Sequence, residues 1–277
     1  MLSLPRRFEA HKPSSLPPGL RGYWPLDEQF PGPIAVDYSG YRSHGTKVGT
    51  TVGAGLGKDG RPVTVFNGTS SDYITLGVPK AVGLKAYTIA CCFYRTGAGA
   101  TFSTGTGGLT MYPLVTHGLG EADGDNRDLN WALGVVSSTG VPGCDFESYN
   151  ASPNNNPVSG ATATTTNVWY HIAGTFDGFN HRIYLNGKLD GTVSSIQTPR
   201  SDSIQHVGIG TAMSSTGART GFFQGRIQDA MVFDRALSIH EIVAISALGF
   251  GRKHQPLPSS ISTTNRRRRL LLCSGGV

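Results

Sequence analysis

The chain has little cysteine, little charge and no long apolar run, and each shortage excludes a class of protein. Its four cysteines are too few for a disulfide framework: Cys91 and Cys92 are adjacent, Cys144 lies in a loop-like stretch and Cys273 in a tail. We expect free thiols, and one disulfide of unspecified pairing stays open. No apolar run approaches the length that crosses a bilayer, so we expect no transmembrane segment. The first residues also lack the apolar core of a conventional signal peptide.

Charged residues make up only 15% of the chain, and its net charge of +6 lies at the two ends. Residues 1–20 carry +2 and residues 249–277 carry +6, which leaves −2 on the body. The last segment contains four consecutive arginines, Arg266, Arg267, Arg268 and Arg269. A basic arm on a near-neutral body favours docking to sister chains, a capsid-like assembly or another acidic surface, with nucleic acid as a minor alternative. A solvated end without a partner is the other interpretation.

What the chain does have is turn chemistry, with 38 glycines and many Ser, Thr and Asn residues. Residues 1–20 hold four prolines, which predicts an extended arm, and residues 249–277 form a tail. Residues 21–248 remain for one all-β domain. Thirteen short strands are predicted, over residues 22–26, 45–48, 63–66, 73–76, 87–95, 111–117, 129–137, 144–149, 168–176, 181–185, 188–193, 206–210 and 226–233. So many short strands favour two packed sheets.

The strongest single signal is a β-hairpin in residues 169–193. Two stretches that alternate apolar and polar residues flank Asn186-Gly187, a pair that tolerates the positive φ angles of a type I′ turn. A later strand over residues 226–233 precedes a short helix over residues 239–248. Ser238 and Glu241 form a capping box at the start of that helix.

Together with Gly22-Tyr23-Trp24-Pro25-Leu26-Asp27-Glu28 and Val65-Phe66-Asn67-Gly68, these motifs resemble, in their order, the laminin-G-like or concanavalin A-like lectin and glucanase family. The resemblance covers residues 21–248. It implies a two-sheet antiparallel jelly-roll sandwich with one short C-terminal helix, here carrying extended tails.

The resemblance also implies one structural calcium ion, with Asp27, Gly45 and Asp229 at the family's ligand positions. Such an ion takes several oxygen ligands and would join the two ends of the domain. The alternative is that Asp27 caps a turn and that Asp229 pairs with Arg226 or Arg235.

Glycoside hydrolases of this fold use paired carboxylates. Glucanase relatives carry Glu-x-Asp-x-x-Glu on one strand, whereas here Glu121-x-Asp123 is followed by Asn126, so the second glutamate is missing. The same acidic stretch also fails as a calcium loop, since Asn126 stands at the sixth position and Ala132 at the twelfth. Asp145 and Glu147 stay open as alternative acids, although nothing marks them as a pair.

Two loops have the composition of a sugar-binding surface, because aromatic rings stack on sugars and amides bind hydroxyl groups. The first supplies Tyr149, Asn154, Asn155 and Asn156, and the second supplies Arg219 and Phe222. Plain turns are the alternative for both.

We therefore expect a non-catalytic recognition or structural module with glycan-binding potential, displayed on a surface or particle. A virion-type decoration or adhesion protein, located on a virion or an extracellular surface, best reconciles an extracellular type of fold with the lack of a conventional signal peptide. The alternatives are a secreted glycoside hydrolase and nucleic-acid contact through the arginine run. Each predicts a different assay result: hydrolysis of a glucan, or binding that weakens steeply with salt.

Overall fold

The computed structural model describes residues 16–28, 32–49, 51–123, 127–149 and 154–248. Most of the predicted N-terminal arm and the whole basic tail, including its four arginines, lie outside these residues. The first strand begins at Leu20, the last residue of the predicted arm. No helix in the described part of the chain is long and apolar enough to cross a membrane.

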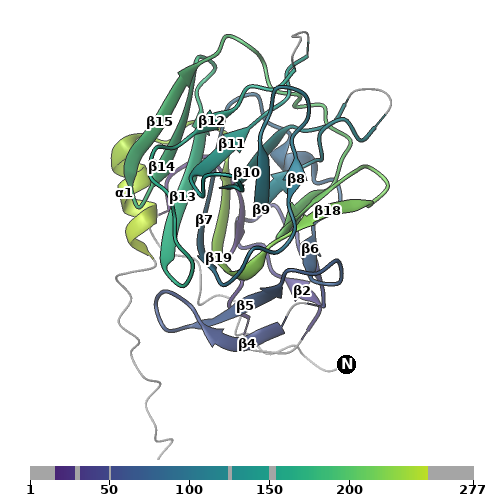
Figure 1. The fold of residues 1–277 in the computed structure, drawn as a ribbon, viewed down its shortest axis with the longest axis vertical. Coiled ribbons are helices and arrows are strands. Elements are labelled where there is room, and N and C mark those ends of the chain that lie inside the picture. The colour runs from purple at the N-terminus through teal and green to yellow at the C-terminus, as the bar shows by residue number, and fades with distance from the viewer. Residues whose placement is uncertain (1–15, 29–31, 50, 124–126, 150–153, 249–277) are drawn as a thin grey trace, which may run out of the picture.

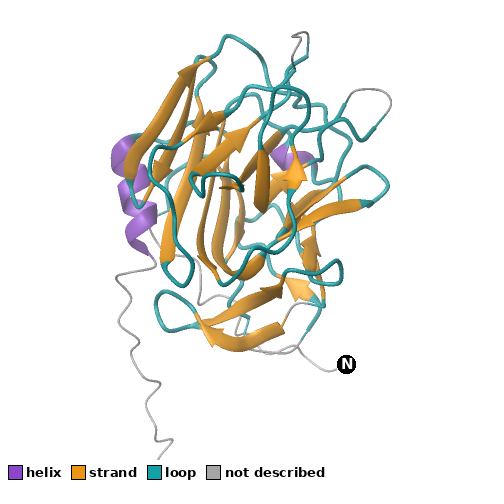
Figure 2. Ribbon diagram, viewed as in Figure 1, coloured by secondary structure: helices purple, strands orange, loops and turns teal. Residues whose placement is uncertain are grey.

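Two large antiparallel sheets form the body (Figures 1 and 2). The first sheet has the order β15 (Lys188–Ser194), β14 (Asn180–Leu185), β13 (Trp169–Phe176), β7 (Tyr87–Arg95), β19 (Gln224–Phe233), β5 (Pro62–Asn67) and β4 (Thr51–Leu56), with β1 (Leu20–Trp24) paired to β19. The second sheet has the order β12 (Val158–Ser159), β11 (Pro142–Asp145), β10 (Trp131–Val136), β9 (Thr110–His117), β16 (Val207–Ile209), β6 (Tyr73–Thr75), β3 (Gly45–Val48) and β2 (Ile34–Ala35), with β8 (Phe102–Ser103) paired to β9. The first and last strands of the domain are neighbours, which closes the sandwich.

Three smaller elements complete the described fold. A short hairpin of β17 (Thr211–Met213) and β18 (Arg219–Phe222) forms a separate two-stranded sheet. A 3₁₀ turn, η1 (Lys80–Val82), precedes β7. The helix α1 (Ile239–Leu248) lies beside β13, β14 and β15 in Figure 1.

The main core lies between the two sheets. Alternate residues of β10 show this: Trp131, Leu133 and Val135 belong to the central cluster, whereas Ala132 and Val136 belong to a separate one on the outer face of the second sheet. The largest fully buried side chains of the central cluster are Trp24, Trp131, Tyr87, Phe66, Phe93, Phe146, Phe176 and Phe223. Each such residue stabilises the fold by roughly 1.5–3 kcal/mol through burial.

Both outer faces are also partly covered. On the first sheet, Ile242 and Ile245 of α1 pack with Tyr184 and Phe233. On the second sheet, Phe102 of β8 and Ala212 of β17 pack with Ala132. Strand β8, the small hairpin and the loops beside them therefore cover the outer face of the second sheet. We call this cover the roof.

The predicted jelly-roll sandwich and its helix are confirmed. Every predicted strand overlaps an observed one, and the helix begins and ends at the predicted residues. Asn186 and Gly187 have φ angles of 50° and 80°, as a type I′ turn requires. The amide of Ser238 donates to Glu241 Oε2 at 2.8 Å, and the amide of Glu241 donates to Ser238 Oγ at 3.4 Å, which completes the capping box.

Candidate functional site

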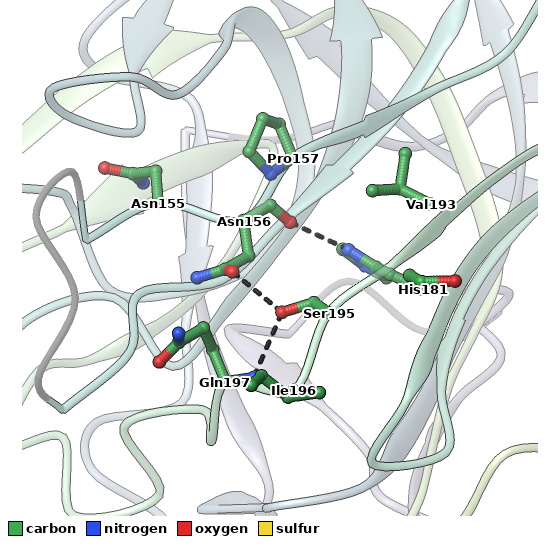
Figure 3. Close-up of a pocket in the computed structure, with 9 residues that line it drawn as sticks. Asn155, Asn156, Pro157, His181, Val193, Ser195, Ile196 and Gln197 are labelled. Carbon is green, nitrogen blue, oxygen red and sulfur yellow. Dashed lines mark hydrogen bonds between the residues drawn. The ribbon is translucent and has the colours of Figure 1, made fainter.

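Two neighbouring pockets lie where the loops after β11 and β15 meet. The first, which we call the loop pocket, has a volume of about 380 Å³ and is lined by residues 155–157, 193–197 and His181 (Figure 3). The second, which we call the Tyr149 pocket, has a volume of about 360 Å³ and is lined by Lys85, Tyr149 and residues 196–198. Ile196 and Gln197 line both pockets, so the two form one continuous surface.

The wall of the loop pocket is held in place from behind by hydrogen bonds. The backbone amide of Asn156 donates to Asp145 Oδ1 at 2.9 Å, and its carbonyl oxygen lies 2.8 Å from His181 Nδ1. Because a carbonyl oxygen can only accept, Nδ1 carries the proton, and Nε2 accepts from the hydroxyl of Tyr87 at 3.1 Å. Burial lowers the pKa of His181 to about 4, so this histidine is neutral near pH 7.

The opposite wall comes from the segment after β15. Ser195 Oγ donates to Asn156 Oδ1 at 2.8 Å and accepts from the Gln197 amide at 3.1 Å, which ties the two loops together (Figure 3). Its own amide donates to the carbonyl oxygen of Phe179 at 2.7 Å. The pocket is therefore a preformed hollow rather than a gap between independent loops.

Apolar and aromatic surfaces border these polar groups. Ile196 is 80% exposed, and Phe179 and Val193 are also exposed. The Tyr149 ring has the Arg200 guanidinium 4.8 Å from its centroid, and its hydroxyl lies 3.2 Å from Ser201 Oγ. Small-molecule sites commonly combine apolar walls with a few placed polar groups.

The structure divides the predicted sugar-binding residues. Tyr149, Asn155 and Asn156 line the two pockets, and Asn154 directly precedes Asn155 in the chain. The amide of Asn155 nevertheless points inward, with Nδ2 2.6 Å from the Thr104 carbonyl oxygen, so its side-chain role is structural.

The two remaining predicted residues lie elsewhere, on β18. Arg219 lies over the ring of Tyr73 at 4.7 Å, and Phe222 bridges to Ala100. They do not line either pocket.

Sequence reasoning missed most of the pocket's second wall. His181, Val193, Ser195, Ile196 and Gln197 were not predicted as site residues. The available signal was an apolar residue, Ile196, between polar neighbours in a segment that directly follows a hairpin.

Comparison with known proteins places this architecture in a family. The family model described as the concanavalin A-like lectin/glucanases superfamily matches residues 67–243. The chain belongs to this superfamily. Comparison with curated protein sequences gave no significant match.

Solved structures of the same fold are distant in sequence. The binding domain of Paraclostridial Mosquitocidal Protein 1 is similar with a TM-score of 0.58 and 14% identity, over 84% of this chain and 53% of the other. This chain thus spans about half the length of that one. Domain 4 of AbnA, an extracellular arabinanase from Geobacillus stearothermophilus solved with arabinotriose, has a TM-score of 0.54 and 17% identity, over 82% and 98%. A Trypanosoma rangeli sialidase solved with sialic acid has a TM-score of 0.54 and 16% identity, over 82% and 32%. At these identities, the likeness shows the fold alone.

In this superfamily member, the two alternative acids lie under the roof of the second sheet. Asp145 pairs with Ala132 on the outer face and is fully buried, and Glu147 is 1% exposed. Thr104 Oγ1 donates to Asp145 Oδ2 at 2.5 Å, and a Cβ at Gly108 would stand 2.7 Å from the same oxygen. Neither carboxyl group is accessible to a substrate in this arrangement.

Burial also changes how these acids titrate. It raises the pKa of Asp145 to about 7, although hydrogen bonds from Thr104 and Asn156 act against this. Burial and the nearby charge of Asp128 raise the pKa of Glu147 to about 8. Glu147 Oε2 accepts from the Leu129 amide at 3.0 Å, whereas Oε1 has no hydrogen bond of normal geometry.

The acidic stretch after β9 holds loops together. Glu121 Oε1 accepts from the Thr106 amide at 2.8 Å. Asp123 Oδ2 accepts from Gln205 Nε2 at 2.7 Å and from the Ser215 amide at 3.1 Å. Asp125 and Asn126 lie outside the described residues.

The predicted calcium ligands do not fit one ion. Asp27 and Asp229 meet, but the guanidinium of Arg61 lies between their carboxylates. Gly45 takes no part in these contacts and pairs with Ala35 in the second sheet. No group of three or more His, Cys, Asp or Glu side chains in the described residues is arranged to hold a metal. Calcium binding itself stays a prediction.

The alternative prediction that Asp229 pairs with Arg226 or Arg235 is also wrong. Arg226 lies over the ring of Tyr94 at 4.9 Å, and Arg235 forms an ion pair with Glu241. The arginine that Asp229 does contact comes from the turn between β4 and β5.

Proposed function

We propose that this chain is a non-catalytic carbohydrate-binding module whose site is the joined loop pocket and Tyr149 pocket. The observation that carries this proposal is the preformed double pocket, in which the side chain of Gln197 lies beside the exposed surfaces of Ile196 and Tyr149, next to a wall that the side chain of Asn156 holds in place. Sugars offer both hydroxyl groups and apolar ring faces, so such a mixed surface suits them.

The solved neighbours support this class of ligand without identifying it. The arabinanase domain was solved with arabinotriose, and the sialidase with sialic acid. The part that shares this fold is 98% of the first chain and 32% of the second, and both proteins were solved with a carbohydrate. The ligand of the present chain is proposed at the level of an oligosaccharide.

The position of the acids supports a non-catalytic role. Retaining and inverting glycosidases place two carboxyl groups on either side of the scissile bond. Here Asp145 and Glu147 are buried under loops and engaged with backbone amides. Binding without hydrolysis is the expected result on a panel of glycans.

We further propose display on a virion or another extracellular particle, with the basic segment 249–277 as the docking arm. Its excess of six positive charges supports an acidic partner surface. Deletion of residues 262–277, which removes the four arginines, should abolish co-sedimentation with the particle or with sister chains. If the chain binds nucleic acid with an affinity that falls steeply as the salt concentration rises, and the same deletion abolishes that binding, the arginine run would instead be a nucleic-acid contact.

The carbohydrate proposal is tested with a glycan array and two matched variants of the full chain. Gln197→Ala removes an amide that lines both pockets, and Arg219→Ala removes the exposed arginine of the other predicted patch. For a glycan bound by the wild type, we expect Gln197→Ala to weaken affinity about tenfold, or about 1.4 kcal/mol. Arg219→Ala should leave affinity unchanged. The reverse order of effects would move the site to β18, and an empty array would remove the proposal.

A further inference from the structure

One guanidinium group holds together the first and last strands of the domain. Arg61 follows the turn between β4 and β5, and three carboxylates surround it, those of Asp27, Asp59 and Asp229. Asp27 comes three residues after the end of β1, and Asp229 lies within β19. Three segments far apart in the sequence thus meet at one positive charge.

The three carboxylates are almost completely buried. Their side chains are 5%, 1% and 7% exposed for Asp27, Asp59 and Asp229, and that of Arg61 is 19% exposed. Arg61 Nη1 donates to Asp27, Nε to Asp59, and Nη2 to Asp229 Oδ2 at 3.2 Å. Each nitrogen of the guanidinium therefore serves a different acid, a geometry that no lysine can reproduce.

The surroundings fix these acids in place. Tyr23 donates its hydroxyl to Asp229 Oδ1 at 2.9 Å, and Gln228 Nε2 donates to Asp59 Oδ1 at 3.0 Å. Leu26 and Asp229 have positive φ angles of 60° and 53°. Positive φ is uncommon outside glycine and costs free energy, so the fold keeps strained backbone at one acid of the cluster and directly before another. The register of β19 against β7 shifts between Gln228 and Met231, at the same place.

Arg61 and Asp59 stabilise each other's charged forms, whereas burial leaves the pKa of Asp229 raised although Arg61 and Tyr23 lower it. Burial lowers the pKa of Arg61, but the three carboxylates outweigh it and raise that pKa overall. Burial raises the pKa of Asp59, but hydrogen bonds from Gln228 and the charge of Arg61 lower it overall. The cluster therefore stays ionised at Arg61 and Asp59 near neutral pH.

We propose that Arg61 is the built-in cation that closes this sandwich, so that the fold does not depend on calcium. A calcium ion bridging Asp27 and Asp229 would have to displace a guanidinium that already binds both. The role that the family resemblance assigns to a metal ion is thereby performed by a side chain of the protein. The inference does not rest on the identity of the ligand.

The test uses the full chain and compares Arg61→Met with Arg182→Met. Arg182 pairs with Asp177 on the surface, where both side chains are about one-third exposed, at 30% and 32%. We expect Arg61→Met to lower the thermal unfolding midpoint by roughly 10 °C, since it leaves buried carboxylates uncompensated. Arg182→Met should lower it by less than about 3 °C. Equal shifts for the two variants would overturn the proposal.

The wild-type chain gives a second readout that does not require the variant to fold. Its unfolding midpoint should be the same in millimolar calcium chloride and in excess EDTA, and terbium luminescence should detect no bound ion. A midpoint that rises with calcium, or a saturable terbium signal, would overturn the proposal. Wild-type calcium independence without any glycan binding would remove the proposed function and leave this inference intact.

Discussion

Burial decides what the acidic residues of this chain do. Asp145 and Glu147 have the side chains that hydrolysis would need, yet the loops over the second sheet close them off and raise the pKa of each. Asp27, Asp59 and Asp229 are equally buried but share Arg61. The first two acids are therefore costly to ionise, whereas Gln228 and Arg61 lower the pKa of Asp59 overall, and at Asp229 burial outweighs Arg61 and leaves the pKa raised.

Glu147→Gln should change how stability depends on pH. The pKa of Glu147 is about 8 in the folded chain and has an ordinary value of 4.5. The folded state thus holds the proton of the Glu147 carboxyl group more tightly than the unfolded state does. The stability that protonated Glu147 contributes is therefore complete below about pH 4.5 and is lost as the pH rises through about 8. We expect the unfolding free energy of the variant to fall less steeply between these values, by up to about 1.4 kcal/mol per pH unit.

Urea unfolding of the wild type and of Glu147→Gln from pH 5 to pH 9 measures this difference in the pH dependence of the unfolding free energy. The matched control is Glu121→Gln, which removes an exposed carboxylate with one hydrogen bond to Thr106. It should leave the slope in this range unchanged. Parallel curves for wild type and Glu147→Gln would show that Glu147 ionises freely in the folded state.

At the scale of elements, the turns are as informative as the strands. Gly187 lies in the turn between β14 and β15 with a φ of 80°, and a Cβ there would stand 2.8 Å from Ser246 Oγ of α1. Gly178, in the turn between β13 and β14, has a φ of 94° and open space around it. Alanine substitutions at the two glycines therefore separate the cost of backbone strain from the cost of a close contact with α1.

Gly178→Ala should lower the unfolding free energy by roughly 1 kcal/mol, since alanine is strained at positive φ. Gly187→Ala should cost roughly 1 kcal/mol more, because its methyl group also pushes on α1. Denaturant unfolding of both variants measures the difference. If the two cost the same, the contact between the hairpin turn and α1 contributes nothing to stability.

The sequence predicted elements whose pattern is local. The hairpin at Asn186-Gly187 and the helix capped by Ser238 depend on near neighbours, and both are confirmed. Six strands were missed: β2, β4, β8, β12, β17 and β18. Several of these are two or three residues long or contain glycine, so they exist because a neighbouring strand pairs with them. The strand predicted to end at Tyr149 ends at Asp145 in the structure. After Asp145 the chain enters the loop that leads to the pocket.

At the scale of the whole molecule, the site arises from contacts that no local pattern specifies. Tyr149, Asn155 and Asn156 were predicted from loop composition, but their partners in the pocket come from residues 193–197, nearly forty residues later. The cluster around Arg61 likewise joins residues that lie far apart in the chain. The family resemblance predicted that Asp27 and Asp229 would be close, and missed the cation between them.

We expect an oligosaccharide to bind at the joined pockets and to leave the covered outer face of the second sheet free. Nuclear magnetic resonance of the isotope-labelled chain, titrated with the best glycan from the array, tests this most directly. We predict amide shifts at Asn156, Ser195 and Gln197, with Asp145 and Glu147 perturbed little and Arg219 unchanged. Shifts centred on Arg219 and Phe222 would overturn the proposed site, and glycan cleavage during the titration would overturn the non-catalytic role.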